Sequence, residues 1–354
     1  MFFQHSKIKL KLLLSQFLAI IPFLIIIFFL IDLWYDTRRF LLIQENMSTA
    51  KIMADYVNFY LYSGLNTSNI LAADPVYTAL QSSKYLDEPD KLKELFVSIK
   101  AELPALDSVS LFDPSGKLIA TSLDILPDRI ESSISDRDYY KKLIESKKPV
   151  FSNPVIGKFS DKYITVTASP VLIDNTIVGI FLSTINLEYL KKTMETQFAR
   201  TDKNIILIDG NGEIVFQINK EIPADSQKKL LKNDSRLIKA LSEKQTVIDN
   251  EILPVSNKPL IGAIASVNGG QFGWSVLSYN YALDIFGPII KTQNFIWVLI
   301  LVSLLVSLSV ISYFLRKIKI VYQSAKSYNI YHFFDVIFLC ISLLLCSNIQ
   351  YAIQ

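Results

Sequence analysis

Histidine and cysteine are almost missing from this chain of 354 residues, which has two of each. All four, namely His5, His332, Cys340 and Cys346, lie near the ends of the chain. The long central part can therefore form no disulfide, offers no thiol nucleophile and cannot build a histidine-based metal site. The sequence also has no glycine-rich phosphate-binding loop and no kinase ATP site. We expect no catalytic residue, no cofactor and no metal, and we predict that the protein is not an enzyme.

An excess of charge of one sign is also absent, because 36 basic residues stand against 33 acidic ones and the net charge is +3. No dense basic patch occurs outside the two flanks of the apolar runs described below. Binding to nucleic acid requires a strong positive field over a domain. We therefore expect no nucleic-acid partner.

Glycine is scarce too, at 11 residues, and its one adjacent pair lies in NGGQFGW at 268–274. The stretch is similar to the GG-x-x-F signature of cyclic-dinucleotide cyclases, with one residue fewer between the glycines and the phenylalanine. A working cyclase motif needs an acidic residue for the metal after the glycines, and Gln271 stands there. Strand-like runs flank the stretch, and Asn and Gly are preferred in hairpin turns. We therefore predict a turn between two strands.

Two long apolar runs carry no charge, LLLSQFLAIIPFLIIIFFLI at 12–31 and FIWVLILVSLLVSLSVISYFL at 295–315. Each has about the 20 residues that a helix needs to cross a bilayer, so transmembrane helices are predicted at 12–33 and 295–315. A cleaved signal peptide is the alternative for the first run, but small residues would then mark the cleavage site. The bulky Trp34 and Tyr35 follow instead, which favours an uncleaved anchor.

Basic residues flank the two runs on the sides away from the centre of the chain. They lie in 1–11 and in 316–354: Lys7, Lys9, Lys11, Arg316, Lys317 and Lys319. Segments rich in Lys and Arg beside a membrane span stay in the cytoplasm. We therefore expect both ends to be cytoplasmic and residues 34–294 to be periplasmic or extracellular. A further apolar stretch at 333–354 is a candidate third membrane segment.

A helical period follows the first apolar run, within a long helix expected at 34–74. Apolar residues recur at alternating steps of three and four: Phe40, Ile43, Met47, Ala50, Ala54, Val57 and Leu61. This 3.5-residue period predicts a seam along one face of the helix. Two interpretations stay open. The seam packs against the helix's own domain, or it pairs with a second copy to form a homodimer.

The period then changes from helix to strand, and the same plan occurs twice. SVSLFDPSGKLIATS at 108–122 and NIILIDGNGEIVFQI at 204–218 each contain two apolar strands around an Asp-x-x-Gly turn. Helices are expected at 135–147 and 224–244, and three more strand-like runs follow each helix. An internal repeat of this kind indicates two copies of one structural unit.

Each repeat therefore predicts an α+β lobe, in which a five-stranded antiparallel sheet carries helices on one face. A distal lobe is expected at 75–190 and a proximal lobe at 191–285. In the distal lobe Ser135 and Asp138 have the spacing of a capping box, which predicts the start of the first short helix.

In this order of elements the chain resembles the double Cache (dCache) sensor domain of bacterial chemoreceptors, sensor histidine kinases and diguanylate cyclases. The resemblance covers residues 34–290. It rests on FDPSGKLIATS, SDRDYYKKLIESKKPVFSNPVIG, ASPVLIDNTIVGIFLSTINLEYL and the second repeat ending in GWSVLSY. It implies two tandem PAS-like lobes, a position in the bacterial inner membrane, and a small-molecule ligand in the membrane-distal first repeat.

Arg137, Tyr139 and Tyr140 are the residues that the resemblance assigns to the ligand. In amino-acid-binding members an arginine and two aromatic residues at this spacing hold the ligand's carboxylate. A guanidinium can do so through two parallel hydrogen bonds. In the alternative interpretation Arg137 pairs with Asp136, Asp138 or a nearby backbone carbonyl at the start of the helix, and the tyrosines belong to the core of the lobe.

Other positions depart from the family pattern. Ser132 and Val155 stand where the family has aromatic residues, and Thr184 stands where it has the aspartate that binds the ligand's amine. Without that carboxylate an ammonium group would lose its counter-charge. We therefore expect a carboxylate without an amine, such as a small organic acid, with Thr184 among its contacts.

The stretch DGNGE at 209–213 has the acidic residues and glycines that also occur in calcium loops. It lacks their length and their distal bidentate glutamate. We therefore predict a turn at this position.

These observations together predict a transmembrane sensor without catalysis. A ligand outside the membrane would shift the domain's conformation, and a separate cytoplasmic or membrane partner would supply the output that this chain lacks. The alternatives are a membrane-anchored scaffold or interaction protein, and a truncated remnant of a diguanylate cyclase or histidine kinase.

Overall fold

The computed structural model describes residues 2–82, 88–124, 133–198, 203–219, 234–253, 256, 258–270 and 272–321. The chain forms two compact units, Met1–Ile31 with Lys291–Gln354, and Asp32–Ile290. Ser132, Gln271 and the segment predicted at 333–354 lie outside the described residues.

The first unit contains one end of each of two long helices, α1 (Phe2–Ala72) and α8 (Ala282–Val321). Within this unit the ring centroids of Phe28 and Trp297 lie 5.2 Å apart. Among the described residues, one helical stretch, Ala282–Val302, is long and apolar enough to cross a membrane. It overlaps the second predicted span, and both predicted spans stay predictions.

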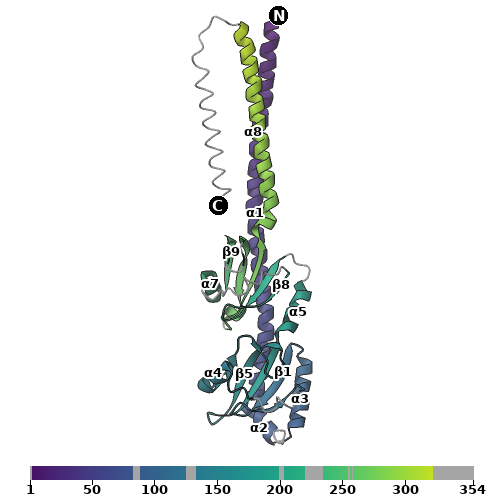
Figure 1. Cartoon of the computed structure of the whole chain (residues 1–354), viewed down its shortest axis with the longest axis vertical. Coiled ribbons are helices and arrows are strands. Elements are labelled where there is room, and N and C mark those ends of the chain that lie inside the picture. Colours follow the sequence, from purple (N-terminus) through teal and green to yellow (C-terminus); the bar gives the residue numbers. More distant parts are fainter. Residues whose placement is uncertain are drawn as a thin grey trace. The chain divides into compact units, whose positions relative to one another are not determined.

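The distal lobe contains a six-stranded antiparallel sheet, which includes both strands of the first predicted hairpin (Figure 1). The strand order is β2-β1-β6-β5-β3, and β4 also pairs with β5. The elements are α2 (Asp74–Ser82), α3 (Pro89–Glu102), β1 (Leu106–Phe112), β2 (Leu118–Thr121), α4 (Asp138–Ser146), β3 (Val150–Phe151), β4 (Val155–Ile156), β5 (Tyr163–Ile173), β6 (Thr176–Asn186) and α5 (Leu187–Phe198).

One carboxylate organises the turn between β1 and β2. Asp113 Oδ1 accepts hydrogen bonds from the backbone N–H groups of Ser115 and Lys117 and from the Ser115 hydroxyl. Gly116 follows with a left-handed φ of 83°. In the second repeat, Asp209 makes the same bonds to the N–H groups two and four residues further on. The internal repeat therefore extends to individual hydrogen bonds, and DGNGE is a turn.

Helices cover both faces of the distal sheet, and the prediction of helices on one face was wrong. On one face Val109 of β1 packs in the same cluster as Phe96 of α3. On the other face Val166 of β5 packs with Leu143 of α4. All residues of β1 are buried, because helices cover both faces of the sheet.

The capping box predicted from Ser135 and Asp138 was also wrong. Helix α4 begins at Asp138, its N-cap is Arg137, and no described side chain caps its first N–H groups. The Ser135 hydroxyl accepts a hydrogen bond from Ser133 instead. The extended backbone of Arg137 therefore places its side chain at the start of the helix, within reach of β4.

The proximal lobe repeats the plan with a five-stranded antiparallel sheet in the order β8-β7-β11-β10-β9. Asp234 caps α7 by accepting a hydrogen bond from the Arg236 N–H. The first part of the helix predicted at 224–244 lies outside the described residues. The elements are β7 (Asn204–Ile208), β8 (Ile214–Ile218), α7 (Ser235–Glu243), β9 (Gln245–Glu251), β10 (Leu260–Ser266), η3 (Val267–Gly270) and β11 (Ser275–Tyr281).

The NGG stretch connects β10 to β11, so the interpretation of NGGQFGW as a turn is confirmed. Asn268, Gly269 and Gly270 have left-handed φ angles of 49°, 60° and 88°. A Cβ at Gly270 would lie 2.6 Å from the carbonyl oxygen of Leu241. Both the backbone angle and the close approach therefore require glycine at this position.

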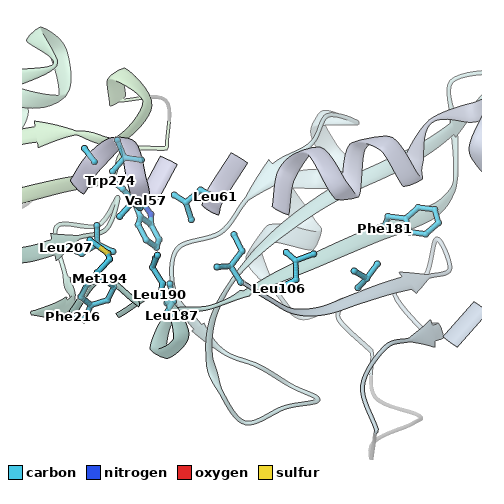
Figure 2. Close-up of a cluster of buried hydrophobic side chains, with 14 of the residues drawn as sticks. Val57, Leu61, Leu106, Phe181, Leu187, Leu190, Met194, Leu207, Phe216 and Trp274 are labelled. Carbon is cyan, nitrogen blue, oxygen red and sulfur yellow. The ribbon is translucent and has the colours of Figure 1, made fainter. Parts of the chain in front are cut away.

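One hydrophobic cluster runs through both lobes along α1 (Figure 2). The exposed fractions of Ala50, Ala54, Val57 and Leu61 are 0%, 2%, 0% and 0%, whereas Phe40 is 61% exposed. From Ala50 to Leu61 the predicted seam therefore packs against its own domain. The cluster continues through α5 into the proximal sheet by way of Leu187, Leu190, Met194, Leu207, Phe216 and Trp274.

A buried polar group joins α1 to β11. The Asn46 amide donates to Asn280 Oδ1 at 3.0 Å and to a backbone carbonyl of α1, and its own oxygen accepts from Ser278 Oγ at 2.7 Å. All three side chains are buried. Arg39 of α1 makes a second connection, a bidentate pair with Asp249 of β9 at 2.6 and 2.7 Å.

Strands β10 and β11 approach each other so closely at Gly262 that a side chain there would clash. A Cβ at this position would lie 2.2 Å from the carbonyl oxygen of Ser278 and 2.8 Å from Cα of Tyr279. We expect Gly262→Ala to lower the free energy of unfolding by about 2–3 kcal/mol, as overpacking does. The measurement is urea unfolding of the full chain in detergent.

The matched control is Gly287→Ala in α8, because apart from its chain neighbours and the helix's own backbone no atom lies within 4 Å of the added Cβ, and alanine favours a helix over glycine. Similar losses of stability in the two variants would contradict the close approach of β10 and β11.

Candidate functional site

A small cavity lies in the distal lobe between the sheet and the segment that follows β3. Its volume is about 30 Å³, enough for one or two water molecules. Strands β1, β5 and β6 supply the floor, and residues 155–160 form a continuous part of the wall. A larger ligand would therefore have to displace part of that wall.

Arg137 lines the cavity from the N-terminal end of α4. Its Nη2 donates a hydrogen bond to the carbonyl oxygen of Ile156 at 3.2 Å. No described carboxylate lies within ion-pair distance of this guanidinium. The alternative interpretation placed the partner of Arg137 at the start of the helix, whereas the carbonyl that Arg137 binds belongs to β4 in the cavity wall.

Lys158 is a second cation in the wall, and sequence reasoning missed it. Its Nζ donates to the carbonyl oxygen of Ser133 and to Asp136 Oδ1, the latter at 2.7 Å. Arg137 thus reaches from the start of α4 to the wall, and Lys158 reaches from the wall to the residues that precede α4. Both bonds hold the wall in place. A lysine in a short loop carries no periodic signal, so the sequence offered no pattern that would have identified it.

The two tyrosines of the predicted group point to different places. Tyr139 is buried and lines the cavity, and burial raises the pKa of its hydroxyl. Tyr140 is not among the residues that line the cavity, and its hydroxyl donates to the carbonyl oxygen of Pro114 at 2.8 Å. Arg137, Tyr139 and Thr184 are therefore brought together at one cavity. Tyr140 instead braces the turn between β1 and β2, and its role as a ligand contact stays a prediction.

Hydroxyl groups form the polar part of the cavity floor. Thr184 of β6 shares a hydrogen bond of 2.7 Å with Ser108 of β1, and Ser110 shares one of 2.8 Å with Thr121. Val155, at a position where the family has a tyrosine, lines the wall. The floor therefore offers hydroxyls that can each accept or donate further bonds.

None of the described residues that line the cavity is acidic. Asp107 of β1 is buried, but it does not belong to the lining, and Lys162 Nζ lies 2.6 Å from its Oδ1. Within the described residues, no group of three or more acidic, histidine or cysteine side chains could hold a metal ion. The cavity as described is cationic.

The fold is that of a known family. A family model with the description Cache domain, in its double form, matches residues 40–289. The chain belongs to the double Cache family. Double Cache domains bind ligands and do not catalyse reactions, so residues 40–289 are a ligand-binding sensor domain, and the family suggests no enzymatic activity in it.

Several solved structures are similar to this chain at low identity. The extracellular domain of rpHK1S-Z16, described as a histidine kinase, has a TM-score of 0.52 and 15% identity, covering 69% of this chain and 95% of that one. The sensory domain of the Campylobacter jejuni chemoreceptor Tlp3 has 0.49 and 16%, with 74% and 99% covered. The Pseudomonas fluorescens chemoreceptor CtaA, in complex with L-isoleucine, has 0.49 and 15%, with 71% and 97% covered. A search of curated proteins found no match.

The turn aspartates of the two Cache lobes have opposite pKa shifts. Partial burial alone would raise the pKa of Asp113, but hydrogen bonds from the Ser115 hydroxyl and from backbone N–H groups outweigh it and lower the pKa. Asp209 is more deeply buried, and burial raises its pKa despite its backbone hydrogen bonds. Asp113 therefore stabilises the fold above its unfolded-state pKa and loses this effect as pH falls. For Asp209 the stabilisation is present below the unfolded-state pKa and is lost as pH rises through the folded pKa.

Replacing each aspartate with asparagine tests whether the two turn aspartates affect stability in opposite directions. Near neutral pH, Asp113→Asn should lower the free energy of unfolding by about 0.5–1 kcal/mol, because charge-assisted hydrogen bonds become neutral ones. Asp209→Asn should raise it by an amount of the same order. Thermal unfolding of the full chain at neutral and acidic pH measures both, and both differences should shrink at acidic pH. Shifts of the same sign at neutral pH would contradict the assignment.

Proposed function

We propose that this double Cache chain is a transmembrane sensor whose distal cavity binds a small organic acid with one carboxylate and no amine. The observation that supports the proposal best is the charge of the cavity. Arg137 brings a guanidinium that has no described acidic partner, whereas Lys158 is already paired with Asp136. None of the described lining residues is acidic. The cavity therefore presents to a ligand one cation, Arg137, that has no described carboxylate within ion-pair distance.

A carboxylate would replace the carbonyl oxygen of Ile156 as the acceptor for Arg137. A guanidinium can make two parallel hydrogen bonds to a carboxylate, with full charge on both partners, whereas Arg137 makes one bond to the neutral carbonyl of Ile156. The Thr184 hydroxyl would contact the ligand from the floor, and the Tyr139 ring would form a side wall. Arg137 would then release the wall at residues 155–160. Binding and opening of the cavity would be one event.

The sensor would act by a shift between two populations, the closed cavity and an opened one. The ligand can move this equilibrium by no more than its difference in affinity for the two states. Strand β11 ends at Tyr281 and α8 begins at the next residue. We infer that residues 34–294 lie outside a bacterial inner membrane, anchored by helices at 12–33 and 295–315. A separate membrane or cytoplasmic protein would receive the signal.

Two alternatives remain distinct from this proposal. A membrane-anchored scaffold would recruit partners without binding a small molecule. A truncated remnant of a diguanylate cyclase or histidine kinase could keep the sensor cavity without its output. Only the first alternative predicts that the cavity binds nothing, so ligand binding separates it from the sensor.

L-lactate and L-alanine make a matched pair of probes, because they differ only in a hydroxyl in place of an ammonium group. We expect lactate to raise the thermal unfolding temperature of the full chain in detergent, and alanine to have little effect. The stabilisation should reach about 2.7 kcal/mol at a hundredfold excess over Kd. Arg137→Met should abolish it. Lys147→Met is the control, since Lys147 donates to the carbonyl oxygen of Asn175 outside the cavity.

Each other outcome has a clear meaning. Stabilisation by alanine equal to that by lactate would contradict the absence of an amine subsite. Loss of lactate binding in Lys147→Met as well as in Arg137→Met would remove Arg137 from its specific role. No stabilisation by lactate, pyruvate, acetate or any other short organic acid would favour the scaffold.

We also propose a homodimer, through a face of α1 other than the buried seam. Ile52, Phe59 and Ile70 are each more than half exposed, and Tyr62 is exposed as well. Ile52 and Phe59 are one heptad apart, the spacing with which parallel helices pair. We call Ile52, Phe59, Tyr62 and Ile70 the exposed stripe. Helix α1 of a second copy would present the same stripe at the same height.

The dimer can be tested with one charge placed in the stripe. Phe59→Glu should shift the full chain in detergent from dimer toward monomer, because pairing would bury the new carboxylates. Val97→Glu on α3 is the control, since Val97 is also exposed and apolar but lies outside the stripe. Light scattering after size-exclusion chromatography measures the mass. A monomeric parent chain, or equal effects of the two variants, would refute the interface.

A further inference from the structure

The cavity wall belongs to a longer segment that also touches the other lobe. We call residues 151–160 the linking segment. At one end, residues 155–160 line the cavity, where Arg137 holds the Ile156 carbonyl and Lys158 holds the start of α4. Whether the cavity is closed or open therefore depends on the position of residues 155–160.

The other end of the linking segment contacts the proximal lobe. The Phe151 ring centroid lies 4.8 Å from that of Phe272 and 5.5 Å from that of Trp274, both in the connection from η3 into β11. Asn153 Oδ1 accepts a hydrogen bond of 3.2 Å from the N–H of Gly210, in the β7–β8 turn. The same short segment thus touches two turns of the proximal sheet, between β7 and β8 and between β10 and β11.

Between the two ends of the linking segment, Ser152 is held by hydrogen bonds and Pro154 makes the backbone stiff. Ser152 makes three hydrogen bonds to β5: its N–H and hydroxyl bond to Val166 at 2.8 and 2.9 Å, and its carbonyl accepts from Thr165 Oγ1 at 2.6 Å. Pro154 follows, and its ring fixes its own φ and restricts Asn153 to extended conformations. Displacement of the cavity end would therefore be passed on as rotation about Ser152, rather than absorbed between the two ends.

The contact in the proximal lobe has room to respond. A groove of about 440 Å³ borders Phe151 and Phe272. Trp274 beside them is fully buried, and its indole N–H has no hydrogen-bond partner among the described residues. An apolar contact without a directional bond to Trp274 can slide at low cost, whereas a hydrogen-bonded one would resist.

We propose that Phe151 and Asn153 are positioning residues that couple the closed or open state of the distal cavity to the β7–β8 and β10–β11 turns of the proximal lobe. The inference rests on the proposed function for the meaning of the cavity as a ligand site. Its physical content does not depend on the ligand, because opening can be imposed by mutation. Since β11 leads directly into α8, this coupling would bring the state of the cavity to the strand that precedes that helix.

Trp274 can report on the coupling by itself once the other two tryptophans are removed. In the full chain in detergent with Trp34→Phe and Trp297→Phe, Trp274 is the only indole. Arg137→Met or Lys158→Met should then each shift the Trp274 emission to longer wavelength, because either change releases the cavity wall. Lys147→Met should leave the emission unchanged, since it removes a bond to Asn175 that lies outside the linking segment.

A second experiment tests whether the coupling between the cavity and Trp274 runs through Phe151 and Asn153. Phe151→Ala together with Asn153→Ala should abolish the effect of Arg137→Met on Trp274, while circular dichroism shows that the lobes stay folded. If this variant does not fold, hydrogen exchange of the backbone around residues 272–276 decides, and it should be faster in Arg137→Met than in Lys147→Met. Unchanged emission and exchange in both Arg137→Met and Lys158→Met would overturn the proposal. Since no ligand is added, failure here would leave the lactate experiment standing, and failure to bind lactate would leave this result standing.

Discussion

Both sheets of the sensor domain complete their cores against the same helix. The side chains of Ala50 and Ala54 are buried, and because they are small the backbone of α1 can come close to the strands it covers. The apolar cluster on this side is continuous from α3 through α1 and α5 to the proximal sheet (Figure 2). Without α1 a large part of one face of each sheet would lose its cover. The cavity, its wall and the contacts between the lobes all depend on sheets that this helix holds in place.

The cationic cavity sits on the face of the distal sheet opposite to α1. Phe112, Val166 and Leu182 contribute both to its lining and to the core against α4. The cluster around α1 and the cluster around α4 are separate, and Phe151 of the linking segment is packed against the α1 cluster. A binding site on one face and a structural core on the other is a division of roles that suits a module which must move and stay folded.

Much of the fold could be predicted from local pattern. The two hairpins were found because Asp113 and Asp209 each begin an Asp-x-x-Gly turn between apolar strands, and this chemistry is local in the sequence. The NGG turn was found for the same reason. The seam of α1 was predicted as a face, but periodicity alone could not decide between the helix's own sheets and a second copy. That decision depends on which surfaces the sheets leave uncovered, which is a property of the whole fold.

The parts that could not be predicted depend on contacts between distant residues. Nothing local shows that Tyr140 reaches Pro114 while its neighbour Tyr139 turns into the cavity, because adjacent helix positions point in different directions. Lys158 acquires its role only when the wall meets the start of α4. The capping box failed because Ser135 found a partner in Ser133, two residues away, and the helix then began later. Helices on both sheet faces follow from strands whose buried small polar residues, such as Ser108 and Ser110, look exposed in a hydrophobicity pattern.

The buried amide of Asn46 has a consequence for how α1 and β11 can slip past each other. Two of its hydrogen-bond partners, Ser278 and Asn280, belong to β11, and the third is a backbone carbonyl of α1 itself. A displacement of α1 along β11 that breaks the two bonds would leave buried polar groups unpaired, at a cost of about 1–3 kcal/mol for each. Sliding of α1 along β11 therefore meets an energy barrier at this pair of elements. A movement transmitted through this contact would pass between discrete positions and would not be gradual.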